Sequence, residues 1–341
     1  MDKGKIICFG EMMLRLNCPG YRRFTEASGL EMLYGGSEAN VAILLARLGM
    51  DVEYVTRLPA NDLADAAVQA LTSQGVKTSF LLRGGERMGL YFSETGNSVR
   101  ATRIIYDRSH SGFSTVMPGM VPWKKIFGGA SWFHWSGISP AVSASAAEVC
   151  MEALQEARAN GIRISADFNH RNTLWKYGQK PGDVMPGLLE HCEVVTGDLD
   201  SASVYFDIPV AGKIPLKEAV VHCGKALQQK LPAMRTLGMS FREMLADGSL
   251  AYCGMLMCGE EIDFHGPYRI HQPVGRIGSG DAFMGGLLYG VMQELSNRET
   301  IAFATAAGAL KHSIVSDIPL FSAKEVLALI QDGPGTGKVF R

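Results

Sequence analysis

The chain has little net charge and lacks a long apolar run. Among its 341 residues, 33 are basic and 34 acidic, which gives a formal net charge of −1. This balance argues against the basic surface by which proteins bind nucleic acid or anionic membranes. Apolar stretches such as 41–46 and 302–310 are far shorter than the roughly 20 residues that cross a bilayer. Residues 1–5 lead directly into a strand-like run, so we expect a cytoplasmic protein.

The cysteines lack the spacing of a disulfide framework or a zinc site. Seven are scattered along the chain, with no C-x-x-C pair and no histidine at metal-ligand spacing. His191-Cys192 and His222-Cys223 could suggest a thiol and an imidazole acting together. Because neighbouring side chains point apart on a helix or a strand, we interpret these pairs as ordinary core or surface residues.

The chain has enough apolar residues for a large core, and their pattern alternates between strand and helix. Hydrophobic residues make up 47% of the sequence and charged residues 20%. Strands are expected at 6–9, 51–56, 130–135, 162–168, 193–195 and 251–257, and helices at 39–48, 143–160, 217–229, 282–293 and 299–311. This order predicts a single α/β domain over residues 1–341, with a doubly wound, mostly parallel central sheet flanked by helices.

Two stretches interrupt this alternation, within about 12–33 and 88–110. They carry aromatic and β-branched residues in polar alternation without a helical period. We interpret them as strands of a small β appendage. Strands inserted there could form a lid that closes over a substrate and excludes water, or they could be an ordinary edge hairpin.

A glycine-rich turn at 275–286 runs into an apolar helical segment with Asp281 at the junction. Small residues let backbone N–H groups converge on an anion at a helix N-terminus. A carboxylate there is better explained as a base acting on the group that attacks a phosphate, although a plain turn with an acidic first-turn residue is the alternative. Phe283 replaces the third glycine of a dinucleotide fingerprint, which excludes that motif. The Walker-like tail at 333–339 is one residue short, and we expect a flexible tail.

Motifs along nearly the whole chain resemble those of ribokinase-like (PfkB-type) sugar kinases. They lie in the family's order at 9–16, 34–42, 57–62 and 278–283. A narrower set resembles 2-keto-3-deoxygluconate kinases, at 87–92, 105–108, 132–138, 167–171, 174–175 and 335–339. The resemblance implies transfer of the γ-phosphoryl group of ATP, with Mg²⁺, to the terminal hydroxyl of a sugar acid to give a 6-phosphate.

The resemblance also implies roles for individual residues. Asp281 would be the base, and Gly278, Ser279 and Gly280 would donate backbone N–H groups to the transferring phosphoryl. For the nucleotide it implies Asn169, Thr236 and Gly238 together with Gly278 and Gly280, and for Mg²⁺ an indirect contact through Asp200. For the sugar acid it implies Gly35, Gly36, Asn40, Tyr91, Tyr106, Arg108, Arg171 and Asp317, with the two arginines as carboxylate partners.

Several residues depart from the family's pattern. Gly275 stands where many members carry an aspartate linked to monovalent cations, so activation by K⁺ is not expected. The segment 197–200 replaces an N-x-x-E element linked to Mg²⁺, Met239 follows Gly238 where a glycine is usual, and Ser279 replaces a common alanine. These departures keep two alternatives open: a neutral-sugar kinase of the fructokinase type, and a catalytically weak homologue that binds sugar acid or nucleotide. We also expect a homodimer or higher homo-oligomer formed through the lid.

Overall fold

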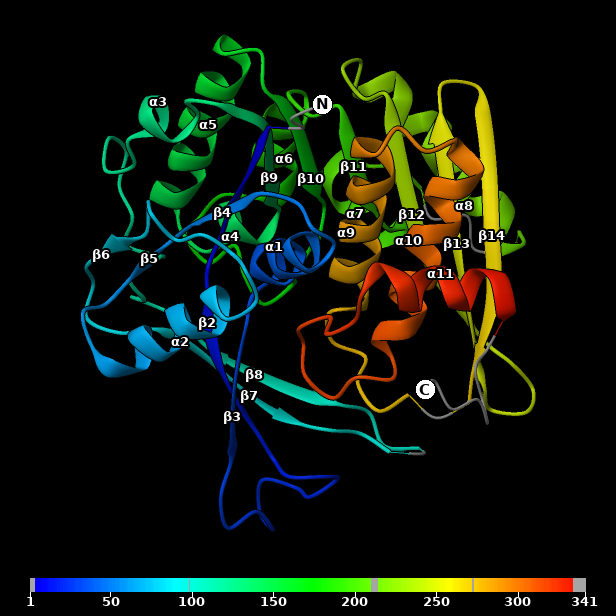
Figure 1. Ribbon diagram of the computed structural model, residues 1–341, viewed down its shortest axis with the longest axis horizontal. Coiled ribbons are helices and arrows are strands. Elements are labelled where there is room, and N and C mark those ends of the chain that lie inside the picture. The colour runs from blue at the N-terminus through cyan, green and yellow to red at the C-terminus, as the bar shows by residue number, and fades with distance from the viewer. Residues whose placement is uncertain (1–3, 98, 210–213, 272, 334–341) are drawn as a thin grey trace.

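An eight-stranded sheet forms the centre of the protein (Figure 1). The computed structural model describes residues 4–97, 99–209, 214–271 and 273–333. The strands lie in the order β14 (Glu261–Ile270), β13 (Leu250–Cys258), β12 (Thr236–Met244), β11 (Val194–Gly197), β10 (Arg163–Asp167), β9 (Ala130–Ser136), β1 (Lys5–Phe9), β4 (Val52–Val55). From β12 to β4 neighbouring strands are parallel, and β13 and β14 are antiparallel. This confirms the predicted mostly parallel sheet. The tail motif at 335–339 lies outside the described residues.

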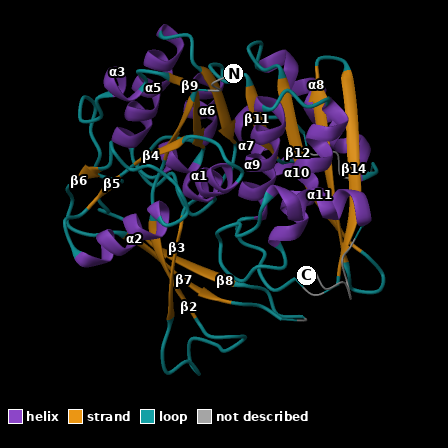
Figure 2. Cartoon of the chain, viewed as in Figure 1, coloured by secondary structure: helices purple, strands orange, loops and turns teal. Residues whose placement is uncertain are grey.

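Helices cover both faces of this sheet (Figure 2). Side chains alternate along β1, so Ile7 and Phe9 pack into one core and Ile6 and Cys8 into the other. The first core is closed by α3 (Trp123–Ile126), α5 (Ala144–Ala159), α6 (Pro181–Leu189), α7 (Leu199–Phe206) and α8 (Leu216–Lys230). The second is closed by α1 (Ser37–Arg47), α2 (Asp62–Thr72), α9 (Ser279–Met292) and α10 (Asn297–Lys311). Helix α11 (Ala323–Asp332) packs on α10, and α4 (Ile138–Ala141) follows β9.

A second sheet of four strands projects from this body (Figure 1). Its order is β3 (Glu31–Gly35), β2 (Met13–Asn17), β7 (Gly89–Glu94) and β8 (Arg103–Asp107). Strands are therefore present in both stretches where a β appendage was expected. Arg15, Tyr91 and Tyr106 are in register across three strands, so their side chains share one face, and Leu16, Phe92 and Ile105 share the other. A further pair of short strands, β5 (Arg57–Leu58) and β6 (Leu82–Arg83), lies apart from both sheets.

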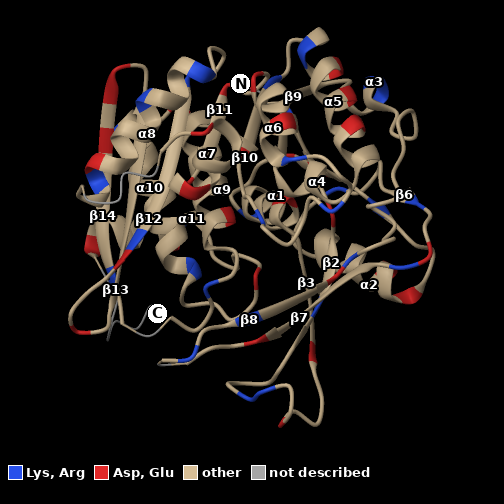
Figure 3. Cartoon of the chain, turned by 180° about the vertical axis from the view of Figure 1, so that it is seen from behind, with Lys and Arg blue, Asp and Glu red and all other residues tan. Residues whose placement is uncertain are grey.

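One strand of the central sheet, β14, was not predicted from the sequence. It is an edge strand whose residues alternate only weakly between half-buried and exposed, so its sequence carries little strand signal. Acidic and basic residues are scattered over the body and the small sheet (Figure 3). Within the described part of the chain, no helix has both the length and the apolar character needed to cross a membrane.

Candidate active site

A pocket of about 320 Å³ opens at the carboxyl ends of the parallel strands. After β1 the chain adds β4 on one side of the sheet and then returns to β9 on the other, so the strand order reverses beside β1. Loops that follow strands on either side of such a point diverge and leave a crevice. The pocket takes its lining from the starts of α1 and α9, from the loops after β9 and β10, from the end of β11, from β12, and from the small sheet.

The glycine turn places an uncapped helix N-terminus in this pocket. Gly278 has φ 85° and ψ 1° and precedes the first residue of α9, and no side chain caps the helix. A Cβ at Gly278 would lie 2.2 Å from the main-chain oxygen of Asp317, so a larger residue would displace the turn. The first N–H groups of a helix have no intrahelical partner and bind anions well. The lining includes Gly278, Ser279, Gly280 and Asp281, which brings the predicted phosphoryl site together.

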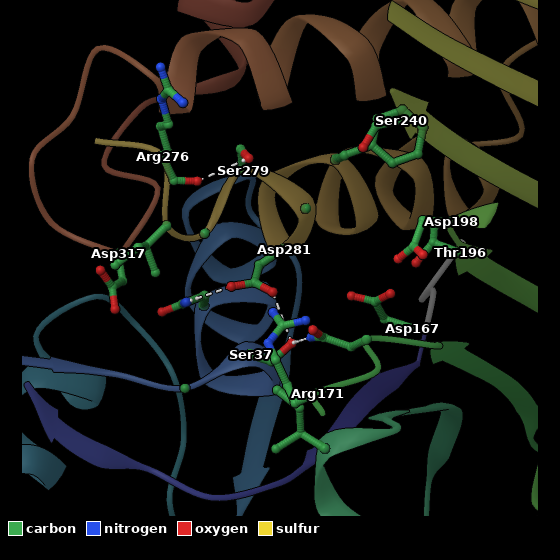
Figure 4. A pocket seen from close by; sticks show the side chains of 18 of the residues that line it. Ser37, Asp167, Arg171, Thr196, Asp198, Ser240, Arg276, Ser279, Asp281 and Asp317 are labelled. Carbon is green, nitrogen blue, oxygen red and sulfur yellow. Dashed lines mark hydrogen bonds between the residues drawn. The ribbon is translucent and has the colours of Figure 1, made fainter. Parts of the chain in front are cut away.

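Asp281 is held by two neutral donors. Its Oδ1 accepts a hydrogen bond from Ser37 Oγ at 2.9 Å, and its Oδ2 accepts one from Asn40 Nδ2 at 2.7 Å. Asn169 Nδ2 donates in turn to Ser37 Oγ at 2.7 Å. Burial raises the pKa of Asp281, while the two hydrogen bonds oppose that rise. The carboxylate is therefore fixed in direction and more basic than an exposed aspartate. In Figure 4 it lies at the centre of the pocket.

Two further carboxylates line the wall beside Asp281, as Figure 4 shows. Asp167 ends β10, and burial, followed by the charge of Asp281, raises its pKa to about 7. Asp198 caps α7 and accepts hydrogen bonds from the N–H and the Oγ of Ser201 at 2.7 and 2.9 Å. Mg²⁺ prefers carboxylate and phosphate oxygens and keeps several waters. Asp167 and Asp198 fit that need, and among the described residues no cluster of three or more potential ligands offers an all-protein cage.

Asp200, the residue predicted to act indirectly on Mg²⁺, lies away from this wall. It is an exposed residue in the first turn of α7 and does not belong to the pocket lining. The acidic residue of this segment that reaches the pocket is Asp198. The offset of two residues arises because Asp198 ends the loop and begins the helix, so its side chain turns back toward the strand ends.

Thr236 and Gly238, which the resemblance assigns to the nucleotide, are not among the residues that line the pocket. Both residues lie in β12, which continues to Met244. Thr236 is the first residue of this strand, so it lies at the end of the strand remote from the pocket. A Cβ at Gly238 would lie 2.8 Å from the Leu287 side chain of α9. The glycine thus permits α9 to pack on the sheet, and neither residue belongs to the pocket lining.

The part of β12 that reaches the pocket lies further along the strand. Ser240 and Arg242 are among the lining residues, and Arg242 Nη2 donates to Ser279 Oγ at 3.0 Å. Ser279 Oγ itself donates to the main-chain oxygen of Arg276 at 3.1 Å. Arg276 also lines the pocket, so two exposed guanidinium groups lie near the glycine turn. Such cations suit the phosphates of a nucleotide.

The small sheet supplies the opposite side of the pocket. Tyr91 and Tyr106 line it from β7 and β8, and their ring centroids are 5.7 Å apart. Gly36 and Asn40 line it from the start of α1. Gly35 is not among the lining residues, but a Cβ there would lie 3.2 Å from Asp317 Oδ2.

Asp317 is buried in a polar network that joins the body to the small sheet. Its Oδ1 pairs with Arg15 Nη1, and its Oδ2 accepts a hydrogen bond from the Tyr91 hydroxyl. Arg15 also donates to Ser93 Oγ at 2.7 Å and to Asn17 Oδ1 at 2.9 Å. Burial raises the pKa of Asp317 to about 6, against the lowering effect of Arg15. Asp317 still lines the pocket, so a sugar hydroxyl could reach it.

The two predicted carboxylate partners lie in different settings. Arg171 is exposed, lines the pocket, and donates to the main-chain oxygen of His170 at 2.9 Å. Arg108 is buried and pairs with Glu11 Oε2, to which its Nε donates at 2.7 Å. It lies outside the pocket lining, with its guanidinium 5.8 Å from the ring centroid of Tyr106. The structure therefore brings Arg171 to the pocket and keeps Arg108 behind Tyr106.

Sequence reasoning missed several pocket residues. Ser37 and Asp167 lie inside motifs that the sequence singled out, but neither received a role. The signal for Asp167 was its place directly after a buried strand, because the carboxyl ends of parallel strands meet at one edge of a sheet. Ser37 begins a helix, and its bond to Asp281 spans 244 positions of sequence, which leaves no local signal. The other lining residues without an assigned role include Thr196, Asp198, Ser240, Arg242 and Arg276.

Comparison with known proteins places the chain in a family. Residues 3–318 match the pfkB family carbohydrate kinase. The crystal structure of a 2-dehydro-3-deoxygluconokinase from Thermotoga maritima is 35% identical, with a TM-score of 0.90, over 96% of this chain and 99% of that one. A 2-dehydro-3-deoxygalactonokinase of Haloferax volcanii is 27% identical over 96% of this chain and 97% of its own length, and a 2-dehydro-3-deoxygluconokinase of Bacillus subtilis is 24% identical over 94% of each. The chain therefore belongs to the pfkB family of carbohydrate kinases, which transfer a phosphoryl group to a sugar hydroxyl.

Proposed function

We propose that this sugar kinase transfers the γ-phosphoryl group of ATP to the terminal hydroxyl of 2-keto-3-deoxygluconate and releases the 6-phosphate. The observation that carries the proposal is the position of Asp281. Its carboxylate faces a pocket that also holds an uncapped helix N-terminus and the guanidinium of Arg171. One cavity thus contains a base, an anion site and a cation for an acidic substrate. Names of relatives at 24–35% identity point to the same substrate class.

The chemistry follows from the fixed direction of Asp281. The terminal hydroxyl oxygen of the sugar acid forms a bond to the γ-phosphorus as the bond between that phosphorus and the β-phosphate oxygen breaks. An Oδ atom of Asp281 takes the hydroxyl proton, and ADP leaves. Ser37 and Asn40 hold the carboxylate in one orientation through both of its oxygens. The N–H groups of Gly278, Ser279 and Gly280 stabilise charge on the transferring phosphoryl, as donors that need no reorganisation.

The nucleotide side is formed by cations and carboxylates of separate elements. Arg242 and Arg276 lie beside the turn and would contact the phosphates, and Asn169 lines the same pocket. Mg²⁺ would be held by Asp167 and Asp198 together with phosphate oxygens and water, and it supplies neutralisation of phosphate charge. Because Asp167 has a raised pKa near 7, a cation beside it would also favour its ionised form.

The acid group of the substrate would bind Arg171, with Tyr91, Tyr106 and Asp317 on the small-sheet side. A carboxylate buried without a cation is costly, and a guanidinium can pair with it through two hydrogen bonds. One observation favours a neutral-sugar kinase instead: Arg108, the second arginine of the expected pair, is already neutralised by Glu11. A neutral sugar has no carboxylate, so it would not require an unpaired arginine. A panel of acidic and neutral acceptors distinguishes the two substrates.

Pairing of two chains through the small sheet is part of the proposal. Leu16, Met32, Phe92 and Ile105 lie in one row across the face that points away from the pocket. Met32 is 52% exposed and Ile105 53% exposed. An apolar row of this kind is stabilised when a second copy covers it. Sedimentation of the purified protein, with an Ile105→Lys variant beside it, tests this: the wild type is expected as a dimer or higher assembly and the variant as a smaller species.

The test of the proposed function is an acceptor panel. The purified protein is given MgATP with 2-keto-3-deoxygluconate, its galactonate-derived epimer, fructose and ribose, and ADP release and sugar phosphate are measured. We expect kcat/KM to be highest for one of the two keto-deoxy acids, and Asp281→Asn to remove that activity. A higher kcat/KM for fructose would contradict the sugar-acid substrate. Binding of ATP and sugar acid without measurable transfer would show a catalytically weak homologue.

A further inference from the structure

A lysine that the proposed mechanism does not use is buried directly behind the glycine turn. Lys311 is the last residue of α10 and has no exposed surface. Its Nζ donates to the main-chain oxygen of Ile314 at 3.1 Å. Among the described residues, no carboxylate lies within ion-pair distance of Lys311, whereas Asp317 pairs closely with Arg15. A buried ammonium that lacks a contacting carboxylate is costly, and a Met side chain would fill the same space without that cost.

The segment that Lys311 anchors forms the support of the turn. A Cβ at Gly275 would lie 2.1 Å from the main-chain oxygen of Ile314 and 3.1 Å from that of Val315. A Cβ at Gly278 would lie 2.2 Å from the main-chain oxygen of Asp317 and 3.3 Å from Lys311 Cε. Main-chain atoms of residues 314–317 and the lysine stem therefore pack against the turn, and Gly278, Ser279 and Gly280 of the turn line the pocket.

The charge of Lys311 acts on the same groups. Burial lowers the pKa of Lys311 to about 8, and the negative charge of Asp281 opposes that change. Lys311 and Arg171 lower the pKa of Asp281 in return. Arg15 on β2 also lowers the pKa of Lys311. His312, the next residue along the chain, is uncharged near neutral pH, because burial lowers its pKa to about 4. Below pH 8 the ammonium thus adds positive potential on the closed side of the phosphoryl site.

We propose that Lys311 is a positioning residue for phosphoryl transfer: its buried ammonium tethers residues 314–317 behind the glycine turn and gives the anion site a built-in cation. The inference rests on the proposed function, because it assigns the turn to the transferring phosphoryl. Lys311 acts through the turn and does not touch the reactants. A purely structural tether would need the hydrogen bond to Ile314, and it would not need the charge.

The test compares Lys311→Met and Lys311→Ala with the wild type. Both variants remove the cation; Met keeps the volume and Ala leaves a cavity. We expect kcat to fall about ten- to a hundred-fold in each, which is less than for the loss of a donor that contacts the reacting group, because Lys311 acts through the turn; the KM for the sugar should change less. Methylammonium at high concentration should restore part of the activity of Lys311→Ala and none of Lys311→Met, whose side chain fills the site. Tetramethylammonium, which cannot donate a hydrogen bond, controls for salt.

Lys225→Met on α8 is the matched control, since Lys225 is exposed and is not among the residues that line the pocket. It should keep the kcat of the wild type. Wild-type kcat in Lys311→Met would overturn the inference, and so would a loss in Lys311→Ala that methylammonium does not relieve while the folded fraction, followed by circular dichroism, stays unchanged. If Lys311→Ala does not fold, Lys311→Met decides by kcat alone.

A second readout separates this inference from the proposed function. ATP binding, measured by calorimetry without sugar, should weaken about tenfold in Lys311→Met, because the turn loses the potential that favours phosphate. That result supports the role of Lys311 even if no acid in the panel is phosphorylated. Unchanged ATP affinity together with unchanged kcat would contradict it, whichever sugar proves to be the substrate.

Discussion

The glycine turn and the small sheet face each other across one pocket but handle charge in opposite ways. At the turn, Asp281 accepts hydrogen bonds from neutral donors, and its cationic neighbours Arg171 and Lys311 act at longer range. On the small sheet, Arg15 pairs directly with Asp317 and Arg108 with Glu11, and all four side chains are at most 7% exposed.

This contrast separates chemistry from scaffold. A carboxylate held by neutral donors keeps its charge and basicity for a reacting proton, while one paired with arginine is largely neutralised. The paired side chains of the small sheet fix its position against the body. On the turn side, Arg171, Arg242 and Arg276 line the pocket, and in the proposed mechanism they would supply the positive charge that meets the reactants.

The sharpest test of the contrast is Asp281→Asn. An amide keeps the size of the side chain and can still accept from one neighbour, but it cannot take a proton. We expect kcat to fall about 10²–10⁴-fold, with little change in the KM for the sugar. Steady-state kinetics on the preferred acceptor measures this. Asp247→Asn, in the turn between β12 and β13, is the control that should keep wild-type kcat; a comparable loss there, or none at Asp281, would remove the assigned base.

Breaking the pair on the small sheet should instead affect stability. Arg15→Met leaves Asp317 buried beside Tyr91 without its cation, and loss of one partner of a buried pair costs about 3–5 kcal/mol. We expect a fall of that size in the free energy of unfolding, measured with denaturant. The double variant Arg15→Met/Asp317→Asn should recover part of the loss, because the uncompensated charge is gone. Equal losses in the single and double variants would argue against an energetically important pair.

Arg171 tests the substrate side of the comparison. Its guanidinium lacks a carboxylate partner within ion-pair distance among the described residues, so we expect it to bind the acid group of the substrate. Arg171→Ala should raise the KM for a keto-deoxy acid about ten- to a hundred-fold, as expected for the loss of a hydrogen-bonded charge contact, and leave the KM for a neutral sugar unchanged. Arg163→Ala, on β10 but outside the pocket lining, is the control. Equal rises for acid and neutral sugars would favour the neutral-sugar kinase.

The smallest effect concerns pH. Asp281 must be ionised to act as base, so kcat falls as pH drops through its raised pKa, above the range of an ordinary aspartate. The hydrogen bond from Ser37 lowers that pKa, and Ser37→Ala removes it. We expect the acid limb of kcat to move to higher pH, because loss of a hydrogen bond to the charged form raises the pKa of the carboxylate. A shift to lower pH in the pH–rate profile would contradict this account of Asp281.

The sequence alone predicted the α/β fold, which the structure confirms, and it placed a candidate anion site with Asp281 at the glycine turn, because both signals depend on near neighbours in the chain. Hydrophobic alternation marks strands and helices locally, and a glycine turn that ends in a helix with Asp281 is a contiguous signal. The motifs also pointed to residues that do line the pocket, such as Asn40, Tyr91 and Arg171. Thr236, Gly238 and Asp200 lie off the pocket because a motif fixes neither where a strand ends nor how a helix turns.

Tertiary structure decided which charges are free and which are paired. Arg15 and Asp317 are 302 positions apart in the sequence, and Arg108 and Glu11 are 97 positions apart, so no local sequence pattern predicts either ion pair. From the sequence, Lys311 is an ordinary basic residue at the end of a helix, but the fold buries it behind the turn. Burial removes water from a charge, and its remaining neighbours then set its pKa and its effect. Those neighbours are fixed by how the sheet and helices pack, beyond what any one segment of the chain encodes.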